Sequence, residues 1–540
     1  MHPYEQLKSF EKWFAGPKRT AFLSSLIIGI FTHVFLLANS LLSPDGVLNS
    51  IYYSAGGWEA SMGRWGINLI DSLRIDRCPA VFVELVCILL GTIAAALIAA
   101  IFDLKHHITA ILTGAVIQLS PAFSITMLYA FTADAYILSF ILILIASLAV
   151  LRCPSGKKLP LICCSILAAV CICFSLGIYQ NYFGVYVGFC IAFALFQLLF
   201  TDQTLKQTLL RLFYGIGTAV AGLVLYFIVT KSAQSFYNVG TVTYQGADQV
   251  GVLNSLKTLP HTIIQSYVNM IRYYLGDSIV YNRPWHRDIF FLILLIAVLI
   301  LAVFLVIRRK LYRNKARFLV SLLLLFLLIP GLNVIALMVP DCYFYATNSM
   351  QMAMLLPLLF VFLERAADSR TSEHPIPLRA EGILQHAALI LSGVLLFTWF
   401  ASDEFSYQYI KQTFNQAEAV SERIIDRVET TDGYYNGIPV MIAGIVSEDL
   451  YYRDSAYADY TWGDVVLAPI SHGSLGFSQE SWRRYLLAYL GMSFNFCTPP
   501  QWEALLATDR FKEMDVFPGK DSVATIDGLM VVKLCEDPPR

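Results

Sequence analysis

Charged residues are scarce in this chain of 540 residues. Only 14% of the residues are Asp, Glu, Lys or Arg, whereas 57% are hydrophobic and the mean hydropathy is +0.61. A soluble globular protein has about 25% charged and about 45–50% apolar residues. The composition therefore excludes a cytosolic enzyme, a disordered protein and a disulfide scaffold, and it predicts a membrane protein with many spanning helices.

An excess of positive charge is also missing. The 38 Lys and Arg residues are balanced by 39 Asp and Glu residues, which gives a formal net charge of −1. A nucleic-acid partner needs a basic surface, so none is expected. No GxGxxG, Walker A or DxD motif is present, and this argues against a cytosolic nucleotide-sugar or ATP substrate. No His/Asp cluster with ligand spacing is present outside the spans, so no metal site and no cofactor are expected.

What the chain does have is long apolar runs. A helix that crosses a bilayer core of ~30 Å needs about 20 apolar residues. Eleven runs approach that length and predict an all-α polytopic membrane protein with about eleven transmembrane helices. Pro121 interrupts the third run, which is expected to be a broken helix or a shorter span with a partly buried loop. The runs are 21–42, 79–101, 108–127, 135–151, 159–176, 182–200, 212–230, 288–307, 318–338, 348–363 and 383–401.

Ionisable side chains are almost absent from these runs: apart from Asp288 at the first position of its run, they contain only His33, Glu84 and His386. Coupled transporters usually keep such groups near the midplane of the bilayer. Their scarcity makes a transporter less expected. Glu84 lies near the outer end of its span. It is expected either to form a hydrogen bond near the membrane interface or to have a functional role.

Basic residues predict the orientation. With the N-terminus in the cytoplasm, half of the 38 Lys and Arg residues fall in cytoplasmic segments, and the short outer loops near 128–134, 177–181 and 339–347 carry none. Eleven spans then place the C-terminal tail outside the cell. The predicted division is a transmembrane domain over 1–401 and an extracytoplasmic α/β domain over 402–540.

Two outer loops and the tail hold most of the polar sequence. The loops cover 43–78 and 231–287, and the second is expected to form an amphipathic helix over 253–275 that acts as a lid, guides a lipid or only packs at the interface. In the tail we expect a charged helix over 406–430, a strand over 438–445, two further helices, and a hairpin over 522–534. The hairpin should turn at Asp527-Gly528. The two further helices are expected over 478–490 and 500–513.

Chemistry is expected in the first outer loop. Ser43-Pro44-Asp45-Gly46 predicts a turn that places Asp45 at the membrane surface, where its carboxylate can serve as a general base or merely cap the turn. Arg64 can hold a phosphate, or pair with a nearby Asp or a lipid headgroup. Trp65 can stack on a sugar ring, or lie in the interfacial aromatic belt.

The order of these motifs resembles the GtrII family of membrane glucosyltransferases, within the broader GT-C glycosyltransferases. An acidic residue after the first span is followed by Gly63-Arg64-Trp65, and three further segments fit. The resemblance covers residues 16–200 well and the later spans only in hydropathy. The three segments are Gly16-Pro17-Lys18-Arg19-Thr20-Ala21-Phe22, Ala133-Asp134-Ala135-Tyr136 and Ser175-Leu176-Gly177-Ile178-Tyr179-Gln180-Asn181-Tyr182.

The resemblance implies a polyprenyl-phosphate-linked donor, with glucose as its sugar, and a surface-glycan acceptor on the outer face. It also implies a first-loop carboxylate as general base, which is Asp45 here with Glu59 as the alternative. Asp134 is expected to be a second acid or a helix cap. A flippase or exporter of a lipid-linked saccharide is the alternative function. Tyr179 and Gln180 are expected to line the cleft that holds the donor. Arg64 is the first candidate to bind the donor phosphate, and Arg272 or Arg283 is the next.

Overall fold

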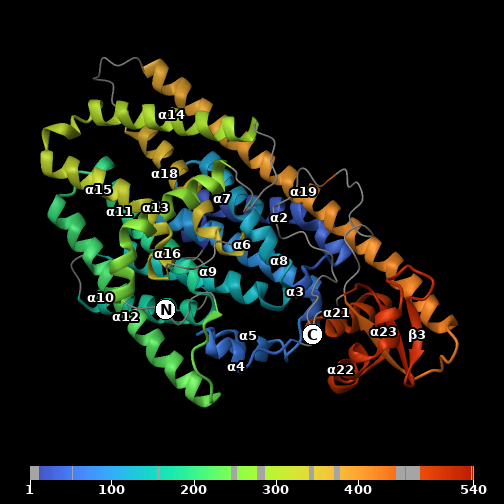
Figure 1. The fold of residues 1–540 in the computed structure, drawn as a ribbon. Helices are drawn as coiled ribbons and strands as arrows, with labels where there is room; N and C mark the ends of the chain where they lie inside the picture. The colour runs from blue at the N-terminus through green and yellow to red at the C-terminus, as the bar shows by residue number, and fades with distance from the viewer. Residues whose placement is uncertain are drawn as a thin grey trace.

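The computed structural model describes residues 11–51, 53–154, 158–244, 252–275, 286–339, 346–369, 378–444, 457, 475–536 and 538. Within these residues, ten helices are long and apolar enough to cross a membrane, and a bent pair brings the number to eleven (Figure 1). The predicted all-α polytopic fold is confirmed. The ten helices are α2 (Pro17–Asn39), α6 (Ala80–Phe102), α9 (Ala130–Leu151), α10 (Lys158–Ile178), α11 (Phe183–Phe200), α12 (Leu205–Phe236), α14 (His286–Arg308), α15 (Lys315–Leu332), α17 with α18 (Met350–Ala353, Leu355–Asp368) and α19 (Leu378–Thr430).

The bent pair is the third predicted span. Helices α7 (His107–Leu119) and α8 (Pro121–Met127) meet at an angle of 43°. Pro121 cannot donate a backbone hydrogen bond, and the Ser120 side chain accepts one from the Phe123 N–H and so begins a new helix. The predicted break at Pro121 is therefore confirmed.

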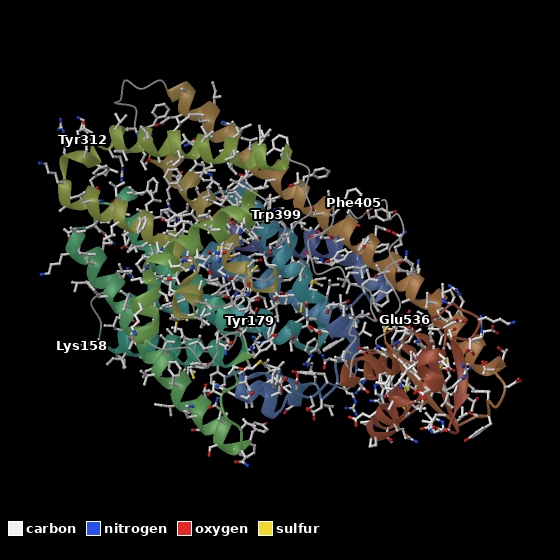
Figure 2. All side chains as sticks on the ribbon, viewed as in Figure 1. Lys158, Tyr179, Tyr312, Trp399, Phe405 and Glu536 are labelled. Carbon is white, nitrogen blue, oxygen red and sulfur yellow. The ribbon has the colours of Figure 1, made fainter. Side chains whose placement is uncertain are left out.

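The two ends of the helix bundle differ in character. One end, here called the loop end, carries the short helices α3 (Pro44–Leu48), α4 (Gly57–Ser61) and α5 (Ile67–Leu73) of the first long loop. The opposite end, the basic end, holds the connections after α6, α9, α11 and α14, where most of the short basic loops lie. In Figure 2, Tyr179 lies inside the bundle, whereas Lys158 and Tyr312 lie at its edge.

The C-terminal part forms a four-stranded sheet with strand order β2-β1-β4-β3. Strand β1 (Pro439–Ala443) pairs in parallel with β2 (Asn495–Phe496) and β4 (Leu529–Lys533), and β3 (Val523–Ile526) pairs antiparallel with β4. Asp527 and Gly528 join β3 to β4 with φ of 49° and 78°, as the predicted hairpin turn requires. Helices α21 (Leu475–Tyr485), α22 (Pro499–Ala507) and α23 (Asp509–Glu513) complete the small α/β part.

A single helix of 53 residues, α19, joins the bundle to this sheet. The predicted domain boundary at 401/402 falls inside that helix, and beyond it Tyr407 still hydrogen-bonds His33 Nδ1 of α2 at 2.8 Å. Helix α21 packs against α3, and the Tyr489 hydroxyl donates to the Ser40 carbonyl at 3.1 Å. The C-terminal part therefore lies beside the first long loop, at the loop end (Figure 1).

The predicted amphipathic helix is present as α13 (Val252–Leu275). It packs beside α14, α15 and the short helix α16 (Val334–Met338). Its Tyr267 hydroxyl donates to the Phe326 carbonyl at 2.6 Å, and its Tyr274 hydroxyl donates to the Met352 carbonyl at 2.9 Å. Packing against the bundle is therefore one role of α13, and its role as a lid or lipid guide stays a prediction.

Glu84 offers a test of burial energetics in α6. The side chain is fully buried, and neither carboxylate oxygen has a hydrogen-bond partner among the described residues. An unsatisfied buried polar group costs about 1–3 kcal/mol. We therefore expect Glu84→Leu to raise the melting temperature of the purified full-length protein.

Glu364 is the matched control for that substitution. Its buried carboxylate accepts hydrogen bonds from the Lys105 N–H at 2.7 Å and the His106 N–H at 3.3 Å. Glu364→Leu leaves those donors unsatisfied and should lower the melting temperature. A fall after Glu84→Leu would show that the Glu84 carboxylate has a partner that stabilises the fold.

Candidate active site

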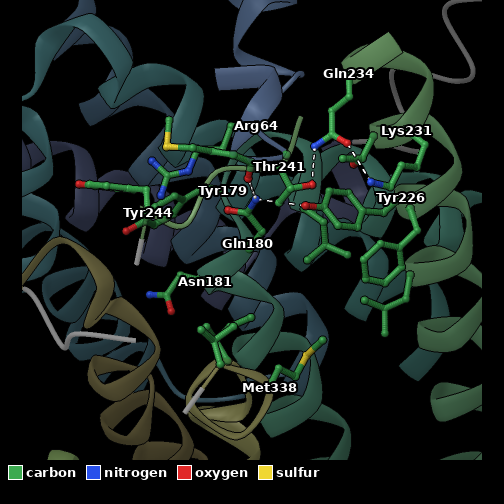
Figure 3. A pocket seen from close by; sticks show the side chains of 18 of the residues that line it. Arg64, Tyr179, Gln180, Asn181, Tyr226, Lys231, Gln234, Thr241, Tyr244 and Met338 are labelled. Atoms are coloured by element: carbon green, nitrogen blue, oxygen red, sulfur yellow. Dashed lines mark hydrogen bonds between the residues drawn. The ribbon is translucent and has the colours of Figure 1, made fainter. Parts of the chain in front are cut away.

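Two cavities meet at the loop end of the bundle. The acidic cavity, of about 700 Å³, is lined by Asp45 and Glu59 together with Tyr53, Trp58, Tyr129 and Tyr136. The apolar cavity, of about 410 Å³, lies among α10, α12 and α16 and is lined by Leu223, Phe227, Ile335, Met338 and Val339 with a few polar groups (Figure 3). Five residues line both cavities and mark the junction between them: Met62, Arg64, Tyr179, Tyr244 and Asn348.

The turn that carries Asp45 is fixed to the end of α8. The N–H and the hydroxyl of Ser43 both donate to the Leu128 carbonyl, at 3.0 and 3.2 Å, and the Ser43 hydroxyl accepts from the Gly46 N–H. A Cβ on Gly46 would lie 2.4 Å from the same Leu128 oxygen, so only glycine allows this approach. The turn predicted from Ser43-Pro44-Asp45-Gly46 thus positions Asp45 in the wall of the acidic cavity.

Glu59, the alternative base, already makes two hydrogen bonds. Its Oε1 accepts from the Tyr53 hydroxyl at 2.7 Å, and its Oε2 accepts from the Gly56 N–H at 2.7 Å, which caps α4. Burial, together with the charge of Glu59, raises the pKa of the Tyr53 phenol, so Tyr53 remains a proton donor to the carboxylate. Both oxygens of Glu59 are therefore occupied in holding the loop.

Arg64 lies at the junction of the cavities. Its Nη1 donates to the Tyr136 hydroxyl at 3.1 Å, and its Cζ lies 5.3 Å from the centroid of the Tyr179 ring. Its Nε is buried without a hydrogen-bond partner in the described part of the chain, and no carboxylate there forms an ion pair with Arg64. The Arg64 guanidinium therefore has N–H groups that can donate hydrogen bonds to a bound anion.

The Gly63-Arg64-Trp65 motif contacts the segment 175–182 in space. The Gly66 N–H donates to the Gly177 carbonyl at 2.6 Å, and Gln180 Nε2 donates to the Met62 carbonyl at 3.0 Å. A Cβ on Gly177 would lie 2.4 Å from the ring of Trp65, so the indole lies directly on this glycine. This contact holds the first long loop against α10 and aims Arg64 at the junction.

Trp65 is placed differently from the sugar-stacking role expected of it. It is buried, its Nε1 donates to the Thr230 hydroxyl at 3.2 Å, and it lines neither cavity. Tyr179 lines both cavities and stacks on Tyr136 with ring centroids 4.1 Å apart. Gln180 lines the apolar cavity and also donates to the Tyr226 hydroxyl at 3.2 Å.

Asp134 is not part of either cavity lining. Its carboxylate forms a buried ion pair with Arg74 at 3.2 Å, and Arg74 also pairs with Asp71. Asp71 in turn accepts from the Ala55 N–H at 2.8 Å. Asp134 therefore ties the first long loop to the start of α9. Sequence reasoning missed Arg74, because a loop arginine carries no local signal of the distant carboxylate that it meets.

Of the remaining predicted cations, Arg272 does not reach the cavities. Arg272 is exposed on α13 and lines neither cavity, and Arg283 lies outside the described residues. Lys231, which sequence reasoning missed, lines the apolar cavity and donates to Gln234 Oε1 at 3.1 Å (Figure 3). The sequence did offer a signal for Lys231. It is a basic residue at the loop end of a span, and the short loops at that end carry few basic residues.

The described residues contain no group of three or more His, Cys, Asp or Glu side chains placed to hold a metal ion.

Gly63 tests how tightly the loop is held. It has φ of +75°, and a Cβ there would lie 2.3 Å from the Tyr226 hydroxyl oxygen. The left-handed conformation alone costs a side chain about 1–2 kcal/mol. We expect Gly63→Ala to lower both the melting temperature and the activity of the protein, and Tyr226→Phe in that background to recover the part caused by the clash.

Gly217→Ala in α12 is the matched control for this change, because a Cβ there meets no atom within 4 Å. It should leave activity unchanged and leave stability unchanged or slightly improved. Equal stability of Gly63→Ala and Gly217→Ala would contradict the close approach of the loop to Tyr226.

Comparison with known proteins gives one family match. The family model described as Glucosyl transferase GtrII matches residues 34–363, which is more than half of the 540 residues. The matched segment includes every residue that lines the two cavities. No curated protein and no solved structure matches the chain.

Proposed function

Because the chain belongs to the Glucosyl transferase GtrII family and is therefore a membrane glucosyltransferase, we propose that its donor is glucose on a polyprenyl phosphate. The observation that carries this proposal is the position of Arg64. Its guanidinium has N–H groups available to a ligand, and it lies at the junction of the apolar cavity and the acidic cavity. A polyprenyl-phosphate sugar has the same order of parts: an apolar tail, an anion and a polar ring.

The apolar cavity suits the tail. Leu223, Phe227, Ile335, Met338 and Val339 are apolar side chains of its wall, and α12, which carries two of them, is exposed along much of its outer face. A tail placed there exchanges lipid contacts for similar protein contacts at little cost, since both surroundings are apolar.

The acidic cavity suits the sugar. Its volume of about 700 Å³ lies in the usual range of about 300–1,000 Å³ for ligand sites. Its wall combines aromatic rings, here Trp58, Tyr129 and Tyr136, with the Asp45 carboxylate. Rings offer apolar faces to a sugar, and hydroxyl and carboxylate groups accept or donate its hydrogen bonds.

The proposed reaction is a displacement at the anomeric carbon. Asp45 takes the proton of an acceptor hydroxyl while the hydroxyl oxygen bonds to that carbon, and the bond from the carbon to the phosphate oxygen breaks. The polyprenyl phosphate leaves as an anion, so it needs a cation rather than a proton. Arg64 supplies that charge, with Lys231 nearby in the apolar cavity. Attack by one displacement inverts the anomeric centre, by analogy with inverting glycosidases.

The acceptor is proposed to be a surface glycan that enters beside the C-terminal part. A third cavity, of about 370 Å³, is lined by Tyr53, Trp58 and Glu59 of the first long loop and by Arg484 of α21. It shares several of its lining residues with the acidic cavity, so a chain entering here reaches Asp45. The basic end is proposed to face the cytoplasm, which puts the cavities and the C-terminal part outside.

Reconstitution tests this function. The purified full-length protein in proteoliposomes, supplied with polyprenyl-phosphate glucose and a surface glycan, is expected to produce hexose-modified glycan detectable by mass spectrometry. Movement of intact donor across the bilayer without modified glycan would support the flippase alternative. Transfer from a nucleotide-linked glucose in the absence of the lipid-linked donor would overturn the proposed donor.

A further inference from the structure

A second site lies at the basic end of the bundle, far from the two cavities along α6 and α9. It is a pocket of about 320 Å³, here called the basic pocket, and three arginines line it: Arg152, Arg211 and Arg365. They come from the end of α9, the first turns of α12 and the last turn of α18. The remaining wall is largely apolar and includes Leu151, Phe193, Phe196, Phe200 and Val361.

The three guanidiniums are held in place by backbone oxygens and not by carboxylates. Each makes one hydrogen bond within the described residues, and none of the three has a carboxylate within ion-pair distance there. The bonds are Arg152 Nε to the Ile101 carbonyl at 2.7 Å, Arg211 Nη2 to the Cys153 carbonyl at 2.6 Å and Arg365 Nη2 to the Phe102 carbonyl at 2.7 Å. A guanidinium has five N–H donors, so most of them are left for a ligand.

Like charges are concentrated in this small space. Arg152 and Arg211 both lie over the Phe193 ring, each with its Cζ 5.7 Å from the ring centroid. Arg211 and Arg365 are both close enough to Arg152 to repel its charge. The charge of Asp103 reaches Arg152 and Arg365, but this carboxylate is bonded to Lys105 at 2.6 Å. Three cations that share one already paired carboxylate are stabilised when an anion binds between them.

We infer that the basic pocket binds the phosphate of an anionic phospholipid. The pocket lies where the apolar helices α6, α9 and α11 end, which is the depth of lipid headgroups. Its phenylalanines give an apolar surface for the glycerol and the start of the acyl chains. A free phosphate ion gains nothing from those rings, so the composition of the wall favours the lipid. This inference does not depend on the proposed donor or on Asp45.

Lipid titration of the purified full-length protein in a neutral detergent tests the inference. Phosphatidylglycerol is expected to raise the melting temperature in a saturable way, whereas phosphatidylcholine is not. A basic residue near an anionic surface contributes about a fivefold gain in affinity. The double variant Arg152→Gln/Arg211→Gln should therefore bind phosphatidylglycerol about 25-fold more weakly, and Arg152→Lys/Arg211→Lys should retain most of the affinity.

The matched control is Arg313→Gln/Lys315→Gln, which removes two exposed charges at the same end that do not line the pocket. It should leave the apparent affinity unchanged. Should the double pocket variant fail to fold, Arg211→Gln alone is expected to lose about fivefold, since it leaves both bonds to the end of α6 intact.

Three results would overturn the inference: equal stabilisation by phosphatidylcholine, unchanged phosphatidylglycerol affinity in the pocket variants, or the same stabilisation by inorganic phosphate alone. The last would assign the pocket to a free anion. In the second case, a melting temperature of the variants that is lowered in every lipid would show that the arginines only hold the helix ends.

Discussion

Replacing Asp45 with Asn should lower glucosyl transfer by about 10²–10⁴-fold, which is the typical loss when a positioned general base is removed. The amide has nearly the shape of the carboxylate but cannot take the proton of the acceptor hydroxyl. The turn should survive, because backbone groups and Ser43 hold it, and Asn49 donates to the backbone carbonyl of Asp45, which the substitution keeps. Initial rates in proteoliposomes, with melting temperatures beside them, measure the effect.

Glu59→Gln is the comparison that decides between the two acids. It alters the cap of α4 and the bond to Tyr53, so a modest fall in stability and a smaller loss of transfer are expected. If Asp45→Asn transfers at nearly the normal rate while Glu59→Gln is inactive, then the base is Glu59. In that case the assignment of the acidic cavity survives, and that of Asp45 does not.

Arg64→Gln should lower the turnover rate by about 10²–10³-fold, because it removes the charge proposed to stabilise the leaving phosphate. Arg64→Lys keeps a cation but loses the planar fork that bonds Tyr136 and lies over Tyr179, so it should retain part of the activity. The loss should appear mainly in kcat, since charge on the phosphate oxygen grows as the bond breaks. Steady-state rates over a range of donor concentrations separate kcat from KM.

Arg77→Gln provides the matched control. Arg77 is an exposed cation of the same loop and lines neither cavity. It should transfer at the normal rate. Equal losses in Arg64→Gln and Arg77→Gln would indicate a general effect of loop charge, and normal transfer by Arg64→Gln would remove Arg64 from the proposed mechanism.

Local features of the fold could be predicted from the sequence. The spans follow from hydropathy, the break at Pro121 from the missing N–H, and the hairpin from the Asp527-Gly528 turn. Each depends on a few neighbouring residues. The continuity of α19 could not be predicted, because its apolar and charged halves look like two separate helices when hydropathy alone is considered.

The candidate site was predictable in its parts but not in its contacts. Residue type and position predicted acidic and basic groups in the first loop, and the structure brings Asp45, Glu59, Arg64 and Tyr179 to one cavity. Whether a loop side chain faces a cavity or the scaffold depends on distant partners. Trp65 faces Gly177, and Asp134 faces Arg74, and neither partner is near in sequence.

The most direct test of the proposed donor site is photocrosslinking. A polyprenyl-phosphate glucose with a diazirine near the phosphate end of its tail, bound to the full-length Asp45→Asn variant, is activated by light, and the labelled peptides are identified by mass spectrometry. The proposed site predicts labels on α12 and α16, around Phe227 and Met338, which excess unlabelled donor suppresses. Labels confined to the basic end or to α14 and α19, with none at the apolar cavity, would contradict it.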